Sequence, residues 1–182
     1  MEKYILNREE VALLIIDIQE RLVPAMKYGK QVIEKTSILL SAAEEMSIPV
    51  LATEQYPKGL GKTVVELDGR LDEARIFEKN SFTAYTEEVK IALDETKRKK
   101  VIITGMETHV CVFHTFRVLL ADGYQVFVFN DGVCSRTKHN HLNGLSLMQS
   151  MGAIITNTES ALFDLLKISG TPEFKVLSKL IK

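Results

Sequence analysis

Three residues that could cooperate in nucleophilic chemistry lie at or soon after the ends of apolar stretches typical of buried strands. Asp17 ends the first stretch, Lys79 ends the third, and Cys111 follows the fourth after a short turn. Parallel strands present their carboxyl ends at one edge of a sheet, where ligands bind in open α/β folds. We therefore expect a carboxylate, an ammonium group and a thiol at the same edge. A carboxylate can take the proton of a thiol, and the resulting thiolate is a nucleophile.

The local sequence places Cys111 in the first turn of a helix. Gly105 breaks the preceding strand pattern, and Thr108 is a good N-cap, which puts the thiol at the third helical position. The helix dipole and free backbone N–H groups would favour a thiolate there. The alternatives are a small apolar cysteine of the core, a solvated strand-end carboxylate at Asp17 and a surface lysine at Lys79.

Strand patterns alternate with amphipathic helical patterns along the chain. Strands are expected at 11–16, 48–53, 75–78, 101–104, 124–129 and 153–156. Helices are expected at 31–46, 87–97, 108 to about 122, 139–150, after 157, and from 172. Six short strands separated by helices predict a six-stranded parallel sheet covered on both faces. Because crossovers are right-handed, the expected fold is α/β, a doubly wound three-layer α/β/α sandwich.

Composition indicates a single domain over residues 1–182. Of the 182 residues, 46% are hydrophobic, enough for a substantial core. There are 23 basic and 24 acidic residues, so we expect no nucleic-acid partner, and the basic run 97–100 should complement the end of the preceding helix. The sequence shows no membrane span and no signal-peptide pattern. Two cysteines suit a reducing compartment, and the expected location is cytoplasmic.

Three motifs at the strand ends resemble those of a known superfamily. They are Asp17-Ile18-Gln19, Lys79-Asn80-Ser81-Phe82 and Gly105-Met106-Glu107-Thr108-His109-Val110-Cys111-Val112. In this order, from about residue 11 to residue 164, the chain resembles the isochorismatase-like cysteine hydrolases. Within that superfamily, the segment 53–61 is most similar to the isochorismatase-domain-containing hydrolases.

The resemblance implies a fold, a site and an activity. The strand order would be 3-2-1-4-5-6, with Asp17 beside Cys111, and the peptide bond between Met106 and Glu107 would be cis. The backbone N–H groups of Glu107 and Cys111 would form an oxyanion hole. Asp17 would accept the thiol proton, Lys79 would lower the pKa values of the carboxyl and the thiol, and Cys111 would form a thioester. The expected reaction is hydrolysis of a small amide or related C–N compound.

The expected substrate pocket contains Gln19, Tyr56, Phe82 and Tyr85, although the three aromatic residues would suit the core equally well. Nicotinamidases hold a metal with histidines after the second strand, whereas the segment 54–61 has none, so no metal and no cofactor are expected. His109 and His114 are five residues apart and would point about 140° from one another on a helix.

Two other functions remain open at this point. The chain could be a non-catalytic interaction protein that keeps a hydrolase fold, or a thiol-based redox sensor that uses Cys111 with Cys134. The expected partners are a small-molecule substrate and further copies of the chain, in a dimer or larger homo-oligomer. Apolar residues that could serve either the core or a subunit interface are Leu145, Leu147, Met148 and Met151.

Overall fold

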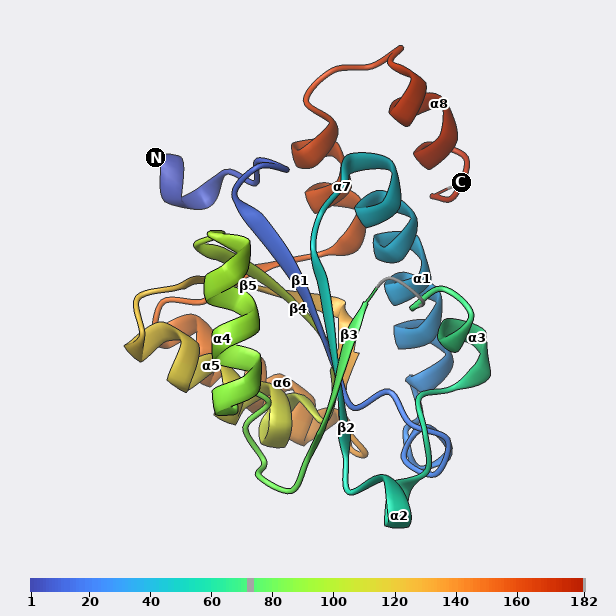
Figure 1. Ribbon diagram of the computed structural model, residues 1–182, viewed down its shortest axis with the longest axis vertical. Coiled ribbons are helices and arrows are strands. Elements are labelled where there is room, and N and C mark those ends of the chain that lie inside the picture. The colour runs from blue at the N-terminus through green and yellow to red at the C-terminus, as the bar shows by residue number, and fades with distance from the viewer. Residues whose placement is uncertain (72–73, 182) are drawn as a thin grey trace.

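A six-stranded sheet runs through the centre of the computed structural model, which describes residues 1–71 and 74–181 (Figure 1). The strands are β1 Val11–Ile16, β2 Val50–Gln55, β3 Arg75–Lys79, β4 Lys100–Met106, β5 Gln125–Cys134 and β6 Ile154–Thr156. All neighbouring pairs are parallel, in the order β3-β2-β1-β4-β5-β6. The predicted sheet and strand order are confirmed.

Helices cover both faces of the sheet. They are α1 Gly29–Met46, α2 Pro57–Leu60, α3 Val65–Asp68, α4 Glu87–Thr96, α5 Phe113–Ala121, α6 Lys138–Ser150, α7 Thr158–Leu166 and α8 Pro172–Leu177. Helices α4, α5 and α6 lie on one side of the sheet, and α1, α3, α7 and α8 lie on the other (Figure 1). Each side has its own cluster of buried apolar side chains. The α/β/α sandwich is thereby confirmed. Within the described ranges, no helix is long and apolar enough to cross a membrane.

Strand β1 is buried along its whole length, as its continuous apolar sequence predicts for a central parallel strand. It pairs with β2 on one side and β4 on the other, so Asp17 emerges between them. Gly105 makes this pairing possible: its φ is +126°, and a Cβ there would lie 2.0 Å from the carbonyl oxygen of Ile16. Only glycine fits this close approach of two backbones.

All strand boundaries but one lie within two residues of the sequence prediction, and the exception is the end of β5. Strand β2 begins and ends two residues later than expected, which brings Gln55 into the strand. Strand β5 continues through Asn130-Asp131-Gly132, which was expected to end it. The pairing of β4 with β5 shifts register between Ile103 and Gly105 and then resumes with Gly105 opposite Val133. Tertiary pairing across a bulge therefore overrides the local turn preference of these residues.

Candidate active site

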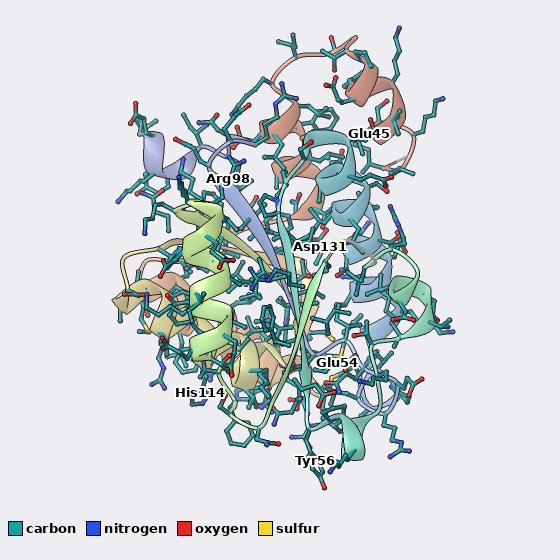
Figure 2. All side chains as sticks on the ribbon, in the orientation of Figure 1. Glu45, Glu54, Tyr56, Arg98, His114 and Asp131 are labelled. Carbon is teal, nitrogen blue, oxygen red and sulfur yellow. The ribbon has the colours of Figure 1, made fainter. Side chains whose placement is uncertain are left out.

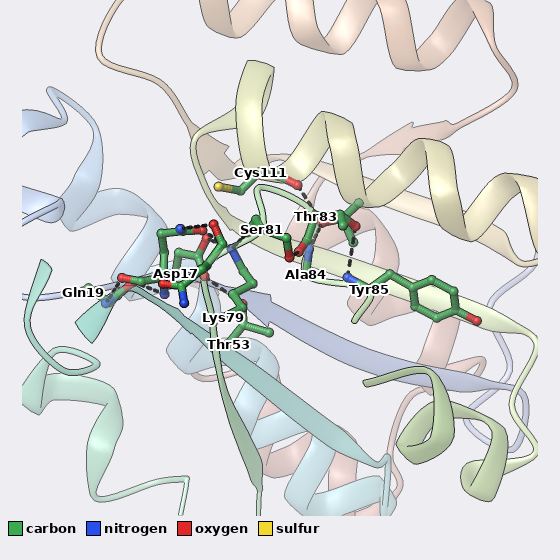
Figure 3. A network of polar contacts seen from close by, with 12 residues as sticks. Asp17, Gln19, Thr53, Lys79, Ser81, Thr83, Ala84, Tyr85 and Cys111 are labelled. Atoms are coloured by element: carbon green, nitrogen blue, oxygen red, sulfur yellow. Dashed lines mark hydrogen bonds and ion pairs between the residues drawn. The ribbon is translucent and has the colours of Figure 1, made fainter. Parts of the chain in front are cut away.

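A buried ion pair lies at the carboxyl edge of the sheet. The Nζ of Lys79, at the end of β3, is 2.7 Å from Oδ2 of Asp17, which follows β1, and both side chains are 0% exposed. Between them runs β2, where the Thr53 hydroxyl donates to Oδ1 of Asp17 at 2.8 Å. Both carboxylate oxygens are thus hydrogen-bonded, which a buried ion pair needs in order to persist (Figure 3).

The ammonium group of Lys79 has two further acceptors. Its Nζ donates to Oε1 of Gln55 at 2.7 Å and to the carbonyl oxygen of Ser81 at 3.2 Å. With Asp17, these acceptors account for all three protons of the ammonium group. The lysine is therefore fixed in position as a charged group, pointing at the carboxylate.

Asp17 adopts an unusual backbone conformation. Its φ is +53°, in the left-handed region, and its N–H donates to the carbonyl oxygen of Thr53 at 3.1 Å. Aspartate tolerates this region better than most side chains. The turn ends the strand and directs the carboxylate into the interior beside Lys79.

Cys111 does not occupy the helix start that the sequence predicts. Residues Thr108–Val112 form a π-helical turn, η3, before α5 begins, and Glu107 holds the N-cap position. The predicted N-cap role of Thr108 is wrong, because its hydroxyl bonds to Nδ1 of His141 on α6 at 2.9 Å rather than to a backbone N–H. Helical π-turns recur at functional sites.

Helix α6 packs tightly against the turn that carries Cys111. A Cβ on Gly144 would lie 3.1 Å from the backbone N and Cα of His109. The Nδ1 of His109 also hydrogen-bonds with the hydroxyl of Ser135, just after β5, at 2.9 Å. The turn that carries Cys111 is therefore held by a close helix contact and by two side-chain hydrogen bonds.

The electrostatics of the thiol also differ from the prediction. Cys111 is 7% exposed, and burial, together with the negative charge of Asp17, raises its pKa to about 12, although Lys79 acts in the opposite direction. Burial likewise raises the pKa of Asp17 against the effect of Lys79. Lys79 lowers both pKa values, as predicted, but desolvation outweighs its charge, so both pKa values lie above their ordinary values. The resting thiol is protonated, with a buried carboxylate as its neighbour (Figure 3).

The segment before Cys111 has the predicted backbone geometry. The peptide bond between Met106 and Glu107 is cis. The Glu107 carboxylate turns toward Arg136, accepting from its backbone N at 2.9 Å and lying 3.1 Å from its Nε. Across residues 1–71 and 74–181, no acceptor takes the backbone N–H of Glu107. That donor is free to meet an oxygen of a bound molecule.

The four expected pocket residues divide into two groups. Gln19 is fully buried, and its amide braces the loop after β2: it donates to the carbonyl oxygens of Gln55 (3.0 Å) and Gly61 (2.7 Å) and accepts from the Gln55 N–H. Tyr85 is buried too, with its hydroxyl bonded to Asp122 and its ring pointing away from Lys79 (Figure 3). These two side chains maintain the structure around the site.

The other two pocket candidates are exposed. Tyr56 projects from the end of the molecule near α2 and is 53% exposed (Figure 2). Phe82, just beyond Lys79, is 60% exposed. The Phe82 ring lies 6.3 Å from that of His114, three residues after Cys111. The exposed rings of Tyr56 and Phe82 are therefore available for contact with a molecule that approaches the site.

Sequence reasoning missed Thr53 and Gln55, which contact the ion pair directly. The available signal was their place at the end of the strand that pairs with both β1 and β3. Among the described residues, no group of three or more His, Cys, Asp or Glu side chains could hold a metal ion. His109 and His114 do not converge: one bonds to Ser135 and the other to Arg117.

The fold and the site together define an α/β protein with a thiol, a carboxylate and an ammonium group at the edge of a parallel sheet. The isochorismatase domain family matches residues 11–160. The structure of MAR1 ribonuclease from Caenorhabditis elegans is similar with a TM-score of 0.92 and 37% identity, covering 97% of this chain and 91% of that one.

Two curated relatives extend the comparison. The secreted isochorismatase effector Isc1 of Phytophthora sojae is 39% identical over 93% of this chain and 83% of its own length. Isochorismatase domain-containing protein 1 of Salmo salar is 40% identical over 91% of this chain, which spans 59% of that protein. The chain belongs to the isochorismatase family of hydrolases.

Proposed function

We propose that this chain is a cysteine hydrolase that cleaves a small amide or related C–N compound through a thioester on Cys111. The observation that carries the proposal is the fully buried Asp17–Lys79 pair at 2.7 Å, next to a buried thiol. Burying two charges costs several kcal/mol each, so such a pair beside a nucleophile is typical of a catalytic site.

The first half of the reaction forms the thioester. The Asp17 carboxylate accepts the proton of the Cys111 thiol as the sulfur attacks the substrate carbonyl carbon, and the carbonyl π electrons move onto oxygen. When the tetrahedral intermediate collapses, the C–N bond breaks and Asp17 returns the proton to the leaving nitrogen. Lys79 keeps its proton throughout and balances the charge of the carboxylate.

The second half releases the acid. Asp17 accepts a proton from a water molecule, whose oxygen attacks the thioester carbon, and the C–S bond breaks as the sulfur takes up the proton. In both halves the carbonyl oxygen becomes an anion, which the backbone N–H groups of Glu107 and Cys111 would stabilise. Removing one such donor typically lowers the rate by about a hundredfold or more. Each proton transfer in this scheme uses Asp17, so the proposal needs no metal and no cofactor.

A thiol-based redox sensor is less consistent with the packing. Cys111 and Cys134 are both free, and they pack in different apolar clusters, on the two sides of the sheet. A disulfide between them would require both sulfur atoms to reach one side. A non-catalytic interaction protein would have no use for the buried ion pair.

The proposal treats residues 1–182 as one isochorismatase-like domain that assembles with further copies of itself. Met148 of α6 belongs to the core, whereas Leu147 of the same helix and Met151 just after it are more than 40% exposed and could contribute to a subunit interface. The cytoplasmic location stays a prediction.

The test is intact-protein mass spectrometry after rapid mixing with a panel of small amides, with hydrolysis followed in parallel. We expect an acyl mass on the wild-type protein, and loss of both the adduct and turnover in Cys111→Ala. Cys134→Ala is the matched control, since it removes the other buried cysteine, and it should keep both signals. Amide turnover that survives Cys111→Ala would overturn the proposal.

A ribonuclease activity is a separate outcome of the same experiment, because the structure from Caenorhabditis elegans carries that name. An RNA oligonucleotide is therefore included in the panel. Cleavage of this RNA by wild type and Cys111→Ala alike, with no acyl adduct from any amide, would contradict the cysteine hydrolase.

A further inference from the structure

Thr115 joins two segments that carry separate parts of the site. It lies on α5, four residues after Cys111, and is completely buried. Its hydroxyl donates to the carbonyl oxygen of Cys111 at 2.6 Å and accepts the backbone N–H of Ala84 at 2.7 Å. Both hydrogen-bonding functions of this buried hydroxyl are therefore in use.

Ala84 belongs to the segment that leads from Lys79 to helix α4. This segment also supplies the Ser81 carbonyl oxygen that accepts from the Lys79 ammonium group. A continuous path of hydrogen bonds and short backbone links thus runs from Asp17 through Lys79 and this segment to Thr115 and the Cys111 turn. Figure 3 shows its first part, from Asp17 to Ala84.

The two hydrogen bonds of Thr115 differ in the sequence separation of their partners. A threonine hydroxyl that bonds to the carbonyl four residues earlier is a common local feature of helices. The bond from Ala84 is not local, because the two residues are 31 positions apart. It connects α5, which follows the Cys111 turn, to the segment after β3. The sheet itself makes no such connection, because β3 and β4 are not neighbouring strands.

We propose that Thr115 is a positioning residue that holds the Cys111 turn in register with the Asp17–Lys79 pair. The inference rests on the proposed function, since the register matters only if Asp17 takes the thiol proton. Small displacements of a nucleophile from its base can lower a rate by up to a hundredfold. A valine would keep the shape of Thr115 and remove both hydrogen bonds.

The experiment measures the rate of Cys111 alkylation by iodoacetamide across a pH series, with peptide mapping to separate Cys111 from Cys134. We expect Thr115→Val to react about tenfold more slowly at neutral pH, with a pH profile shifted toward that of Asp17→Asn. Thr115→Ser keeps the hydroxyl and should restore the rate and the profile. Thr36→Val is the matched control, because it removes a buried hydroxyl that bonds to Thr104 at 3.2 Å and that comes from α1, on the other side of the sheet from α5 (Figure 1).

The double variant separates positioning from general packing. If Thr115 acts through the register of Asp17 and Cys111, Thr115→Val should cause no further loss in the Asp17→Asn protein. The same tenfold loss in both backgrounds would overturn the inference, as would a Thr115→Val protein that reacts like wild type. Thermal unfolding of each variant identifies one that has not folded, and Thr115→Ala then replaces Thr115→Val in the series.

The proposed function fails in a different way. If wild type and Asp17→Asn react at the same rate at every pH, Asp17 gives the thiol no assistance, whatever Thr115 does. If the alkylation rate falls in Asp17→Asn but not in Thr115→Val, only the positioning role of Thr115 is refuted.

Discussion

Two buried lysines lie at opposite ends of the sheet, each paired with a carboxylate. Lys79 closes β3 at the carboxyl edge and bonds to Asp17, whereas Lys100 opens β4 at the amino edge and bonds to Glu10 at 2.7 Å. Each ammonium group also donates to backbone oxygen: Lys79 to Ser81, and Lys100 to Ile5 at 2.7 Å. The two sites thus use similar chemical groups in similar numbers.

The difference lies in the burial of the acidic partner. The Asp17 side chain is 0% exposed and that of Glu10 is 49% exposed. Burial accordingly raises the pKa of Asp17, while the hydrogen bond from Lys100 lowers the pKa of Glu10. A carboxylate that keeps its contact with water is a stable anion suited to anchoring the amino-terminal segment. A fully buried one binds a proton more readily and can therefore serve as a base for the adjacent thiol.

The largest expected effect comes from removing each lysine in turn. Lys79→Met leaves the buried Asp17 without its counter-charge, so the carboxyl takes up a proton and can no longer act as a base. We expect turnover to fall by on the order of a hundredfold or more. Lys100→Met should lower the free energy of unfolding by about 1–3 kcal/mol and leave turnover of the folded protein unchanged. Urea unfolding and amide hydrolysis measure the two quantities. Equal losses of activity in the two variants would show that Lys79 has no special role in the reaction.

The second effect concerns pH. Asp17 must be ionised to accept a proton, so activity is lost as the pH falls through its raised pKa. In the pH profile of kcat/KM, the apparent pKa of the acid limb should therefore lie above 3.8, the ordinary pKa of aspartate. A Lys100→Met protein should show the same limb, because the amino edge takes no part in proton transfer. An acid limb below 3.8 would mean that Lys79 outweighs desolvation at Asp17.

The smallest effect is expected for Glu10→Gln. Because the pKa of Glu10 is lowered from 4.5 in the folded protein, its contribution to stability is present above that value and is lost as the pH falls through the folded pKa. The pair is partly solvated, so the contribution is about 0.5 kcal/mol or less. Unfolding free energies of wild type and Glu10→Gln should differ at neutral pH and converge in acid, with unchanged hydrolysis. A difference that persists in acid would assign the effect to packing.

The sequence was informative wherever a strand end carried a reactive side chain. Asp17, Lys79 and Cys111 could be placed at one edge because the carboxyl ends of parallel strands meet there. The polar residues of the intervening strand were missed. Thr53 and Gln55 carry no reactive group, and their role depends on the register of β2 between its neighbours.

Predictions from local sequence were wrong where contacts with distant residues determine the structure. Thr108 has the side chain of an N-cap, but His141 from α6 takes its hydroxyl and the turn is π-helical. The dipole argument for a thiolate leaves out the cost of desolvation, which decides the pKa of Cys111 because this residue is almost fully buried. The direction of the Tyr85 ring depends on the position of Asp122 at the end of α5, which no periodicity in the sequence specifies.

The most direct test is an ultraviolet titration of the Cys111 thiolate, taken as the difference between wild type and Cys111→Ser so that Cys134 cancels. It determines whether the resting thiol is protonated and gives its proton to Asp17 only during attack. We expect no Cys111 thiolate signal at neutral pH, with the signal rising only in strong alkali, as a pKa of about 12 requires. A thiolate already present at neutral pH and lost in Lys79→Met would contradict this expectation, and would indicate a preformed thiolate–lysine ion pair.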